Sequence, residues 1–127
     1  MELGGGDSCF AKAVCDSDQL QISRYDVVDN NRFALQLFEN KDISVPHRSI
    51  FRDLREDVNG HDANDDNDVN ADTYDFVYSI GLIEHFRGKD IQTLIQRHFD
   101  YCKDGGVVLI SFPTPTLKYS KRQIILT

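Results

Sequence analysis

The stretch YDFVYSI at residues 74–80 decides the fold class. It is rich in aromatic and β-branched residues, which favour strands. Residues 90–103 follow with a helical pattern, and the expected apolar stripe consists of Ile91, Leu94, Ile95, Phe99 and Cys102. Gly105 and Gly106 are expected to end this helix. Residues 107–112 are almost continuously apolar, which is typical of a strand buried on both faces of a parallel sheet.

The same alternation continues toward the N-terminus. Residues 4–7 are a glycine-rich turn, and residues 8–15 predict a short helix. Residues 25–29 predict a strand, and residues 47–52 predict a weaker one. Residues 31–40 predict a helix with Phe33 and Leu37 on one face. Strands that alternate with helices predict an α/β domain with a mostly parallel sheet.

Length and charge limit the classes of function. The 127 residues support one domain, 1–127, and no apolar run approaches the roughly 20 residues of a membrane span. The net charge is −7, with 14 basic and 21 acidic residues. Six of the acids are Asp residues within 57–73, so 15 acids face 14 bases elsewhere, a net charge of −1. Outside residues 57–73 the chain is therefore nearly neutral, so no broad basic surface for binding nucleic acid is expected.

Residues 57–73 differ from the rest of the chain, because ten of these 17 positions are Asp or Asn. So few apolar residues favour a mobile loop inserted between two strands. Asp66, Asp68 and Asn70 match the first ligand positions of a calcium-binding EF-hand loop, but Ala71 replaces its turn glycine and Val77 its bidentate glutamate. We therefore predict no metal site, although cation binding by the loop stays open.

Three cysteines, Cys9, Cys15 and Cys102, form no C-x-x-C pair, and their number is odd. Neither a disulfide framework nor a zinc ribbon is indicated. The N-terminus also lacks a basic region followed by an apolar stretch. We therefore expect a cytoplasmic location.

Four motifs carry candidate chemistry. Gly4, Gly5 and Gly6 form a turn that lets a ligand approach the backbone, although a tight turn without a ligand explains them equally well. Asp29 ends a strand, where a carboxylate can bind ribose hydroxyls or cap the next helix. Asp53 could bind the edge of an adenine while the neighbouring Leu54 packs on its ring, but Asp53 by itself is no better evidence than any surface charge.

The fourth motif ends the strand at residues 74–80. Ser79 and Gly81 are small, and Glu84 and His85 follow as an adjacent acid and imidazole. The carboxyl end of a parallel strand is where such sheets bind ligands. Glu84 and His85 fit a helix-capping pair as well as a proton-transfer site, so His85 is a candidate catalytic residue.

These motifs together resemble the class I S-adenosylmethionine-dependent methyltransferases in order and spacing. The resemblance rests on residues 2–6, 28–29, 52–53, 74–86 and 103–111. It implies a Rossmann-like three-layer sandwich with a mostly parallel sheet. Asp104 stands where the family usually has proline. Compared with the family's seven-stranded fold, the chain looks truncated at both ends, so its sheet is expected to be incomplete.

The resemblance also implies roles for individual residues. Glu2 and the three glycines Gly4, Gly5 and Gly6 would lie against the methionine part of S-adenosylmethionine. Asp29 would bind the ribose hydroxyls, and Asn30 would flank the adenine. Asp53 would meet the adenine amino group, and Leu54 would pack on its ring. Ser79 would close the site beside the methionine end.

The resemblance implies transfer of a methyl group to an acceptor that the sequence does not identify, which we expect to be a small molecule. Unpaired sheet edges would favour homo-oligomers. A non-catalytic remnant that binds an adenosyl ligand or serves as an interaction module is the alternative. A nicotinamide-dependent oxidoreductase is disfavoured, because Cys9 replaces the third glycine of G-x-G-x-x-G and no Tyr-x-x-x-Lys pair occurs.

Overall fold

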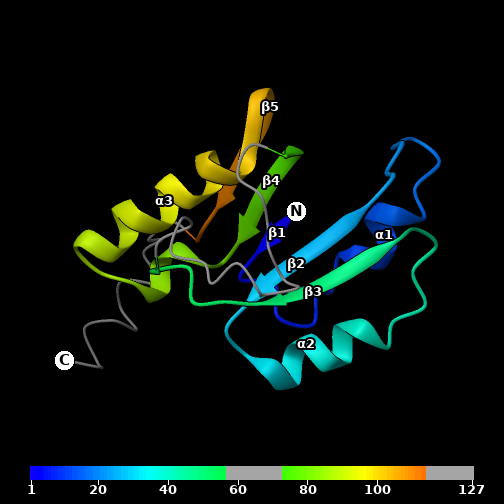
Figure 1. Cartoon of the computed structure of the whole chain (residues 1–127), viewed down its shortest axis with the longest axis horizontal. Coiled ribbons are helices and arrows are strands. Elements are labelled where there is room, and N and C mark those ends of the chain that lie inside the picture. The colour runs from blue at the N-terminus through cyan, green and yellow to red at the C-terminus, as the bar shows by residue number, and fades with distance from the viewer. Residues whose placement is uncertain (57–72, 114–127) are drawn as a thin grey trace, which may run out of the picture.

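A computed structural model describes residues 1–56 and 73–113. Its centre is an all-parallel sheet with the strand order β3-β2-β1-β4-β5 (Figure 1). The strands are β1 (Glu2–Leu3), β2 (Tyr25–Asp29), β3 (His47–Phe51), β4 (Tyr74–Ile80) and β5 (Cys102–Ser111). The helices are α1 (Ala11–Cys15), α2 (Arg32–Glu39) and α3 (Lys89–Tyr101), with a short 3₁₀ helix, η1 (Ile83–His85). The predicted α/β class and parallel sheet are confirmed.

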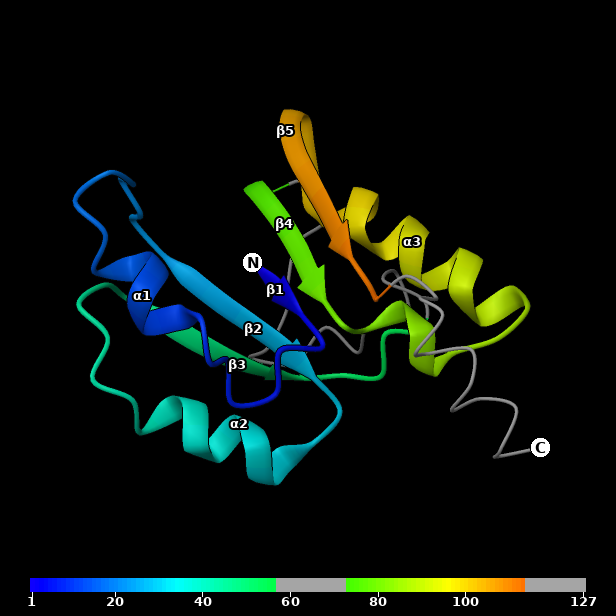
Figure 2. The same cartoon turned by 180° about the vertical axis from the view of Figure 1, so that it is seen from behind.

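The described elements form three layers. Helices α1 and α2 cover one face of the sheet and α3 covers the other, as Figures 1 and 2 show from opposite sides. Under α1 and α2, the buried side chains of Ala11, Leu35 and Phe38 pack with Val27. On the other face, Leu94 and Tyr101 of α3 belong to a second buried cluster that includes Val28, Ile50 and Val77. Residues 1–56 and 73–113 thus have the predicted Rossmann-like architecture, with a five-stranded sheet.

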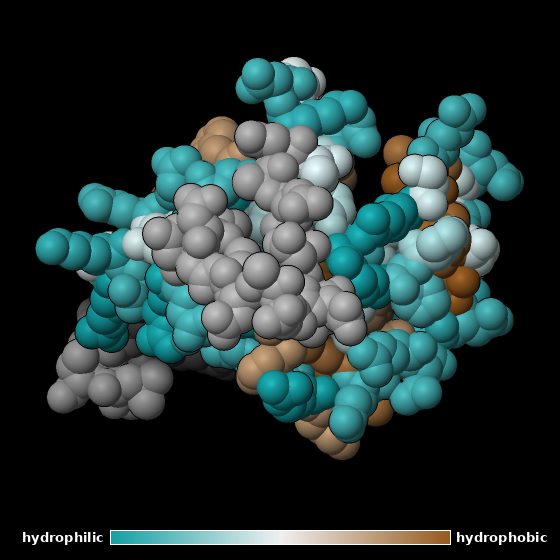
Figure 3. Space-filling view, viewed as in Figure 1, coloured by the Kyte–Doolittle hydropathy of each residue, from teal (hydrophilic) through white to brown (hydrophobic). Residues whose placement is uncertain are grey.

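The face of helix α2 that is buried in the core differs from the predicted one. Leu35 and Phe38 are buried, whereas Phe33 and Leu37 are exposed by 69% and 46%. Figure 3 shows apolar surface gathered over α2 at the lower edge of that view. The helix carries apolar residues on two adjoining faces, and the position of β2 and β3 decides which one is buried. The spacing of apolar residues within the helix does not show which of these two faces is buried.

The boundary between α3 and β5 also corrects the prediction. The helix ends at Tyr101 and the strand begins at Cys102, so Gly105 and Gly106 lie inside β5. A Cβ on Gly106 would lie 2.9 Å from the Asp75 carbonyl oxygen, which shows how closely β4 and β5 approach there. Glycine at this position serves strand packing and does not end the helix.

Strand β5 is not buried on both faces as predicted. Val108 and Ile110 pack against the core on the α3 side, whereas Val107 and Leu109 on the other side are exposed by 57% and 48%. The reason is that no described helix covers β5 on the side of α1 and α2. The expected formation of homo-oligomers through unpaired sheet edges stays a prediction, which analytical sedimentation can test.

Smaller differences concern the N-terminal helix and the insertion. Helix α1 spans only Ala11–Cys15, because Ser8 has a φ of 49°, outside the right-handed helical region. The expected mobile loop at 57–73 lies outside the described residues except for Thr73. Among the helices that the structure describes, none has the length and apolar character to cross a membrane.

Candidate functional site

The glycine-rich turn after β1 lies at the carboxyl edge of the sheet. Gly4 has a φ of 65°, and its N–H donates to the Val28 carbonyl at 2.8 Å. A Cβ on Gly4 would lie 2.4 Å from Cδ1 of Leu82, and one on Gly5 would lie 2.5 Å from Cδ of Glu2. The turn is therefore closely surrounded by protein side chains, and the Leu82 side chain covers Gly4.

Glu2 lies beneath this turn and is buried. Its Oε2 accepts hydrogen bonds from the Ser8 hydroxyl and from the Tyr25 hydroxyl, the latter at 2.6 Å. The Tyr25 hydroxyl also bonds that of Tyr78. Burial, and next the charge of Glu2, raises the pKa of both tyrosines, so their hydroxyls stay protonated. Glu2 thus anchors the glycine turn to β2 and β4 from below.

Ser8 is a site-building residue that sequence reasoning missed. It is buried, and its backbone adopts a positive φ that glycine adopts more readily. Its side chain compensates by bonding Glu2, and its carbonyl accepts from Lys41 Nζ at 2.9 Å. The signal available in the sequence was its place directly after the run of glycines and Asp7.

Asp29 connects the glycine turn to the start of α2. Its Oδ2 accepts from the N–H of Gly6 at 2.8 Å, and its Oδ1 accepts from the N–H of Asn31 at 2.8 Å. Asn31 is the residue that caps α2, through a bond from the Ala34 N–H. Each carboxylate oxygen can accept a second hydrogen bond. Asp29 therefore has a structural role and still offers acceptor capacity to a ligand.

Asp53 follows β3 and is held by Arg55. The Arg55 Nε lies 2.9 Å from Oδ1 of Asp53, and Nη2 lies 2.5 Å from Oδ2. This guanidinium lowers the pKa of Asp53, so the carboxylate stays ionised. Leu54 next to it is buried. Arg52, just before it, is buried too, and its Nη1 donates to the Tyr101 hydroxyl at 3.0 Å.

One pocket of about 250 Å³ brings several of these residues together at the carboxyl edge. Five of the predicted site residues line it: Gly4, Asp29, Asn30, Asp53 and Leu54. They come from three separate loops, after β1, β2 and β3, so only the fold makes them neighbours. Glu2 lies below the turn, and Gly5 and Gly6 are in the turn but do not line the pocket.

The loop after β4 supplies the other wall of the pocket, through Gly81, Leu82, His85 and Phe86. His85 ends the 3₁₀ helix η1 and is exposed. His85 lines the same pocket as Asp29 and Asp53. Its role as a catalytic residue stays a prediction.

Ser79 occupies a different place from the one that the resemblance implies. Its side chain is fully buried, and its hydroxyl lies 2.8 Å from Nε2 of His98. Nδ1 of His98 lies 2.7 Å from the Leu94 carbonyl, so Nδ1 carries the proton and Nε2 accepts from Ser79. Burial lowers the pKa of His98, which keeps the ring neutral. Ser79 thus points toward α3 and joins the sheet to that helix.

His98 was not singled out from the sequence, although it is one of the three fully buried residues of α3, with Leu94 and Tyr101. Its spacing of four from Leu94 and three from Tyr101 was the available signal, but a polar residue on an apolar stripe is easily assigned to the surface. In the described ranges 1–56 and 73–113, no three His, Cys, Asp or Glu side chains gather as metal ligands would.

A protein-family profile described as "Methyltransferase domain" matches residues 1–125. No curated protein matches the chain. The family match covers nearly the whole sequence, and the structure is a parallel sheet with helices on both faces. The chain therefore belongs to the methyltransferase domain family, with the Rossmann-like fold of the class I S-adenosylmethionine-dependent enzymes.

Proposed function

We propose that the pocket at the carboxyl edge binds S-adenosylmethionine and that the chain transfers its methyl group to a small-molecule acceptor. The observation that carries this proposal is the convergence of Gly4, Asp29, Asn30, Asp53 and Leu54 around one pocket. Two carboxylates and an apolar side chain suit the hydroxyls, amino group and ring of an adenosine.

The residues present fit the adenosyl part of the ligand. Asp29 keeps acceptor capacity for ribose hydroxyls although both its oxygens bind backbone N–H groups. Asp53 is ionised and fixed by Arg55, next to the apolar Leu54. The volume of about 250 Å³ is below the range of roughly 300–1,000 Å³ usual for ligand sites. Leu82, which covers Gly4, would turn aside to admit the methionine end.

When bound, S-adenosylmethionine supplies a methyl group already activated by its sulfonium. The protein's contribution is then chiefly to hold the acceptor in line with that methyl group and to exclude water. His85 would accept the proton of a hydroxyl acceptor at a ring nitrogen, since it lines the same pocket as Asp29. An acceptor without such a proton would need no base.

Calorimetric titration with S-adenosylhomocysteine tests the binding half of the proposal. We expect the wild type to bind, and Asp29→Asn to bind about tenfold more weakly or worse, because an ionic hydrogen bond to the ligand is lost. Asp16→Asn is the matched control, since Asp16 is exposed at the end of α1, interacts with Lys12 and Ser44, and does not line the pocket. Urea unfolding of each variant separates lost binding from lost folding.

The result distinguishes the candidate functions. A folded wild type that ignores S-adenosylhomocysteine would refute the proposed site and favour a non-catalytic remnant. If the ligand binds, a screen with methyl-labelled S-adenosylmethionine and pooled small hydroxyl, amine and thiol compounds tests transfer. His85→Asn should then lower kcat for hydroxyl acceptors by a larger factor than it weakens S-adenosylhomocysteine binding.

A further inference from the structure

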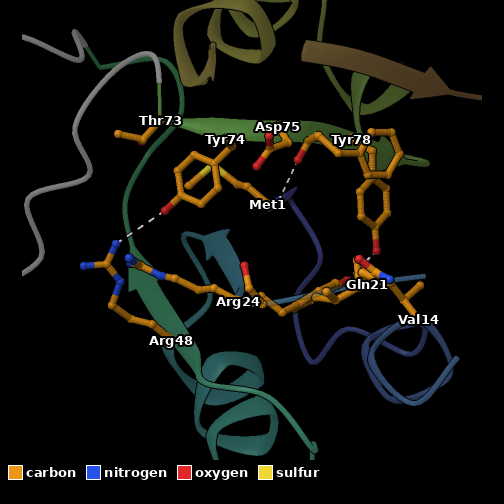
Figure 4. A pocket seen from close by; sticks show the side chains of 13 residues that line it. Met1, Val14, Gln21, Arg24, Arg48, Thr73, Tyr74, Asp75 and Tyr78 are labelled. Carbon is orange, nitrogen blue, oxygen red and sulfur yellow. Dashed lines mark hydrogen bonds between the residues drawn. The ribbon is translucent and has the colours of Figure 1, made fainter. Parts of the chain in front are cut away.

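A second cavity lies at the opposite edge of the sheet from the adenosyl pocket. Its volume is about 500 Å³, and it opens at the amino ends of β1 to β4, around Met1, Arg24, Arg48 and Tyr74 (Figure 4). The two cavities share no lining residue. Whatever binds here would therefore not compete for the site that holds Gly4 and Asp29.

The charges at this cavity are unbalanced. Asp26 is fully buried, and its Oδ2 receives Arg24 Nη2 at 2.7 Å, Arg48 Nη2 at 3.3 Å and the Tyr74 hydroxyl at 2.5 Å. Two guanidinium groups thus share one carboxylate oxygen. Asp26 itself lies behind the lining, and the acid that lines the cavity, Asp75, forms an ion pair with Lys103. The cluster of Arg24, Asp26 and Arg48 keeps one positive charge in excess.

Hydrogen bonding in this cluster is also incomplete. Nε of Arg48 is buried with no hydrogen-bond partner in the part of the chain that the structure describes, and the same holds for Oδ1 of Asp26. A buried polar group without a partner is costly, so the cluster lacks both an acceptor and a donor. The Nε and Nη groups of arginine form a fork that suits the oxygens of a carboxylate or phosphate.

Two aromatic side chains, Phe76 and Tyr78, line another part of the cavity, beside polar residues such as Gln21 and Ser23. The rings of Phe76 and Tyr78 stack with centroids 5.3 Å apart, and Phe76 is exposed by 39%. Figure 4 shows Tyr78 on the side of the cavity away from Arg48, with Met1 between them. A ligand with an oxyanion at one end and an apolar body at the other would meet both parts of this lining. The volume lies within the usual range for small-molecule sites.

We propose that this cavity is a second binding site, which takes a small phosphate monoester with an aromatic or aliphatic body. A phosphate monoester has a second pKa near 6, so near neutral pH it carries between one and two negative charges and presents several acceptor oxygens. These oxygens would accept hydrogen bonds from the guanidinium groups of Arg24 and Arg48, whose side chains are exposed by 51% and 31%. Phe76 and Tyr78 would contact the organic body. This site goes beyond methyl transfer and does not depend on it.

An NMR titration of the full chain with phenyl phosphate tests the proposal. We expect the amide signals of Arg24, Arg48 and Phe76 to shift, while those of Gly4 and Gly81 stay in place. Inorganic phosphate and benzyl alcohol should each bind about tenfold more weakly, because each fills only half of the site. Benzoate, which carries a single charge and only two acceptor oxygens for the two guanidinium groups, should also be weaker.

Variants test the role of the arginines. Arg24→Gln should weaken phenyl phosphate about tenfold, because an ionic hydrogen bond is lost. Arg24 is chosen because its side chain is half exposed and its loss leaves the pair of Arg48 and Asp26 intact. Arg87→Gln, at an exposed position in another loop, is the matched control and should bind as the wild type does.

Three outcomes would overturn the proposal. One is no shift at the cavity with up to about 10 mM phenyl phosphate, which exceeds the roughly millimolar Kd expected of so small a ligand. Another is equal weakening by Arg24→Gln and Arg87→Gln. The third is displacement by saturating S-adenosylhomocysteine. Since the titration reads amides far from Gly4, it remains valid even if S-adenosylhomocysteine does not bind.

Discussion

Replacing Ser79 with alanine separates a structural role of this residue from a role in ligand binding. Its hydroxyl is fully buried and donates to Nε2 of His98, whose Nδ1 is engaged by the Leu94 carbonyl. Ser79→Ala therefore leaves Nε2 as a buried acceptor without a donor. That loss costs about 1–3 kcal/mol. With about 2 kcal/mol lost, Tm should fall by roughly 6–8 °C in a domain of this size.

Urea unfolding gives the free energy of unfolding, and calorimetry with S-adenosylhomocysteine gives the affinity. We expect Ser79→Ala to lose about 2 kcal/mol of stability while the Kd stays the same, because the hydroxyl is directed to α3. Ser111→Ala is the control, since Ser111 is exposed on β5, and it should change stability by less than about 0.5 kcal/mol. Unchanged stability together with a weaker affinity would refute the assignment and restore Ser79 to the ligand site.

Three further outcomes are expected. Tyr25→Phe removes the hydroxyl that bonds Glu2, so the free energy of unfolding measured in urea should fall by about 1–3 kcal/mol; no change would show that the buried network contributes nothing. Burial lowers the pKa of His98 in the folded state, so below the ordinary histidine pKa of 6.5 the unfolded chain binds a proton that the folded chain does not. The free energy of unfolding should therefore fall with acidification by up to about 1.4 kcal/mol per pH unit, and His98→Gln should lack this pH dependence. Phe38→Ala should cost about 3–5 kcal/mol by thermal or urea unfolding and Phe33→Ala less than about 1, and equal losses would contradict the orientation of α2.

Much of the site could be predicted because strand ends are local features. Asp29 directly follows an apolar pair, Asp53 comes just after the predicted strand at residues 47–52, and the glycines mark a turn, so each position could be found from its neighbours in sequence. Parallel strands bring their carboxyl ends to one edge, which is why these residues meet around one pocket. His85 belongs to the same group, since it follows the strand at residues 74–80.

The residues that differed from prediction are those whose environment depends on packing between distant segments. Ser79 was expected beside the ligand, but alternation along β4 turns its side chain toward His98 of α3. Glu2 was expected in the pocket, yet hydroxyls from β2 and β4 hold it beneath the turn. Neither direction can be obtained from spacing alone, because it depends on which face of the sheet each helix covers.

By itself, the amino-acid sequence determined the alternation of strands and helices, the parallel sheet and the positions of the glycine turn and of Asp29. These features follow from hydrophobic periodicity and backbone preferences, which act over a few residues. Only the tertiary structure decided that Leu35 and Phe38 are buried in α2 while Phe33 is exposed, and that Arg24 and Arg48 converge on Asp26. The physical reason is that burial and ion pairing act between segments that the chain brings together only when it folds.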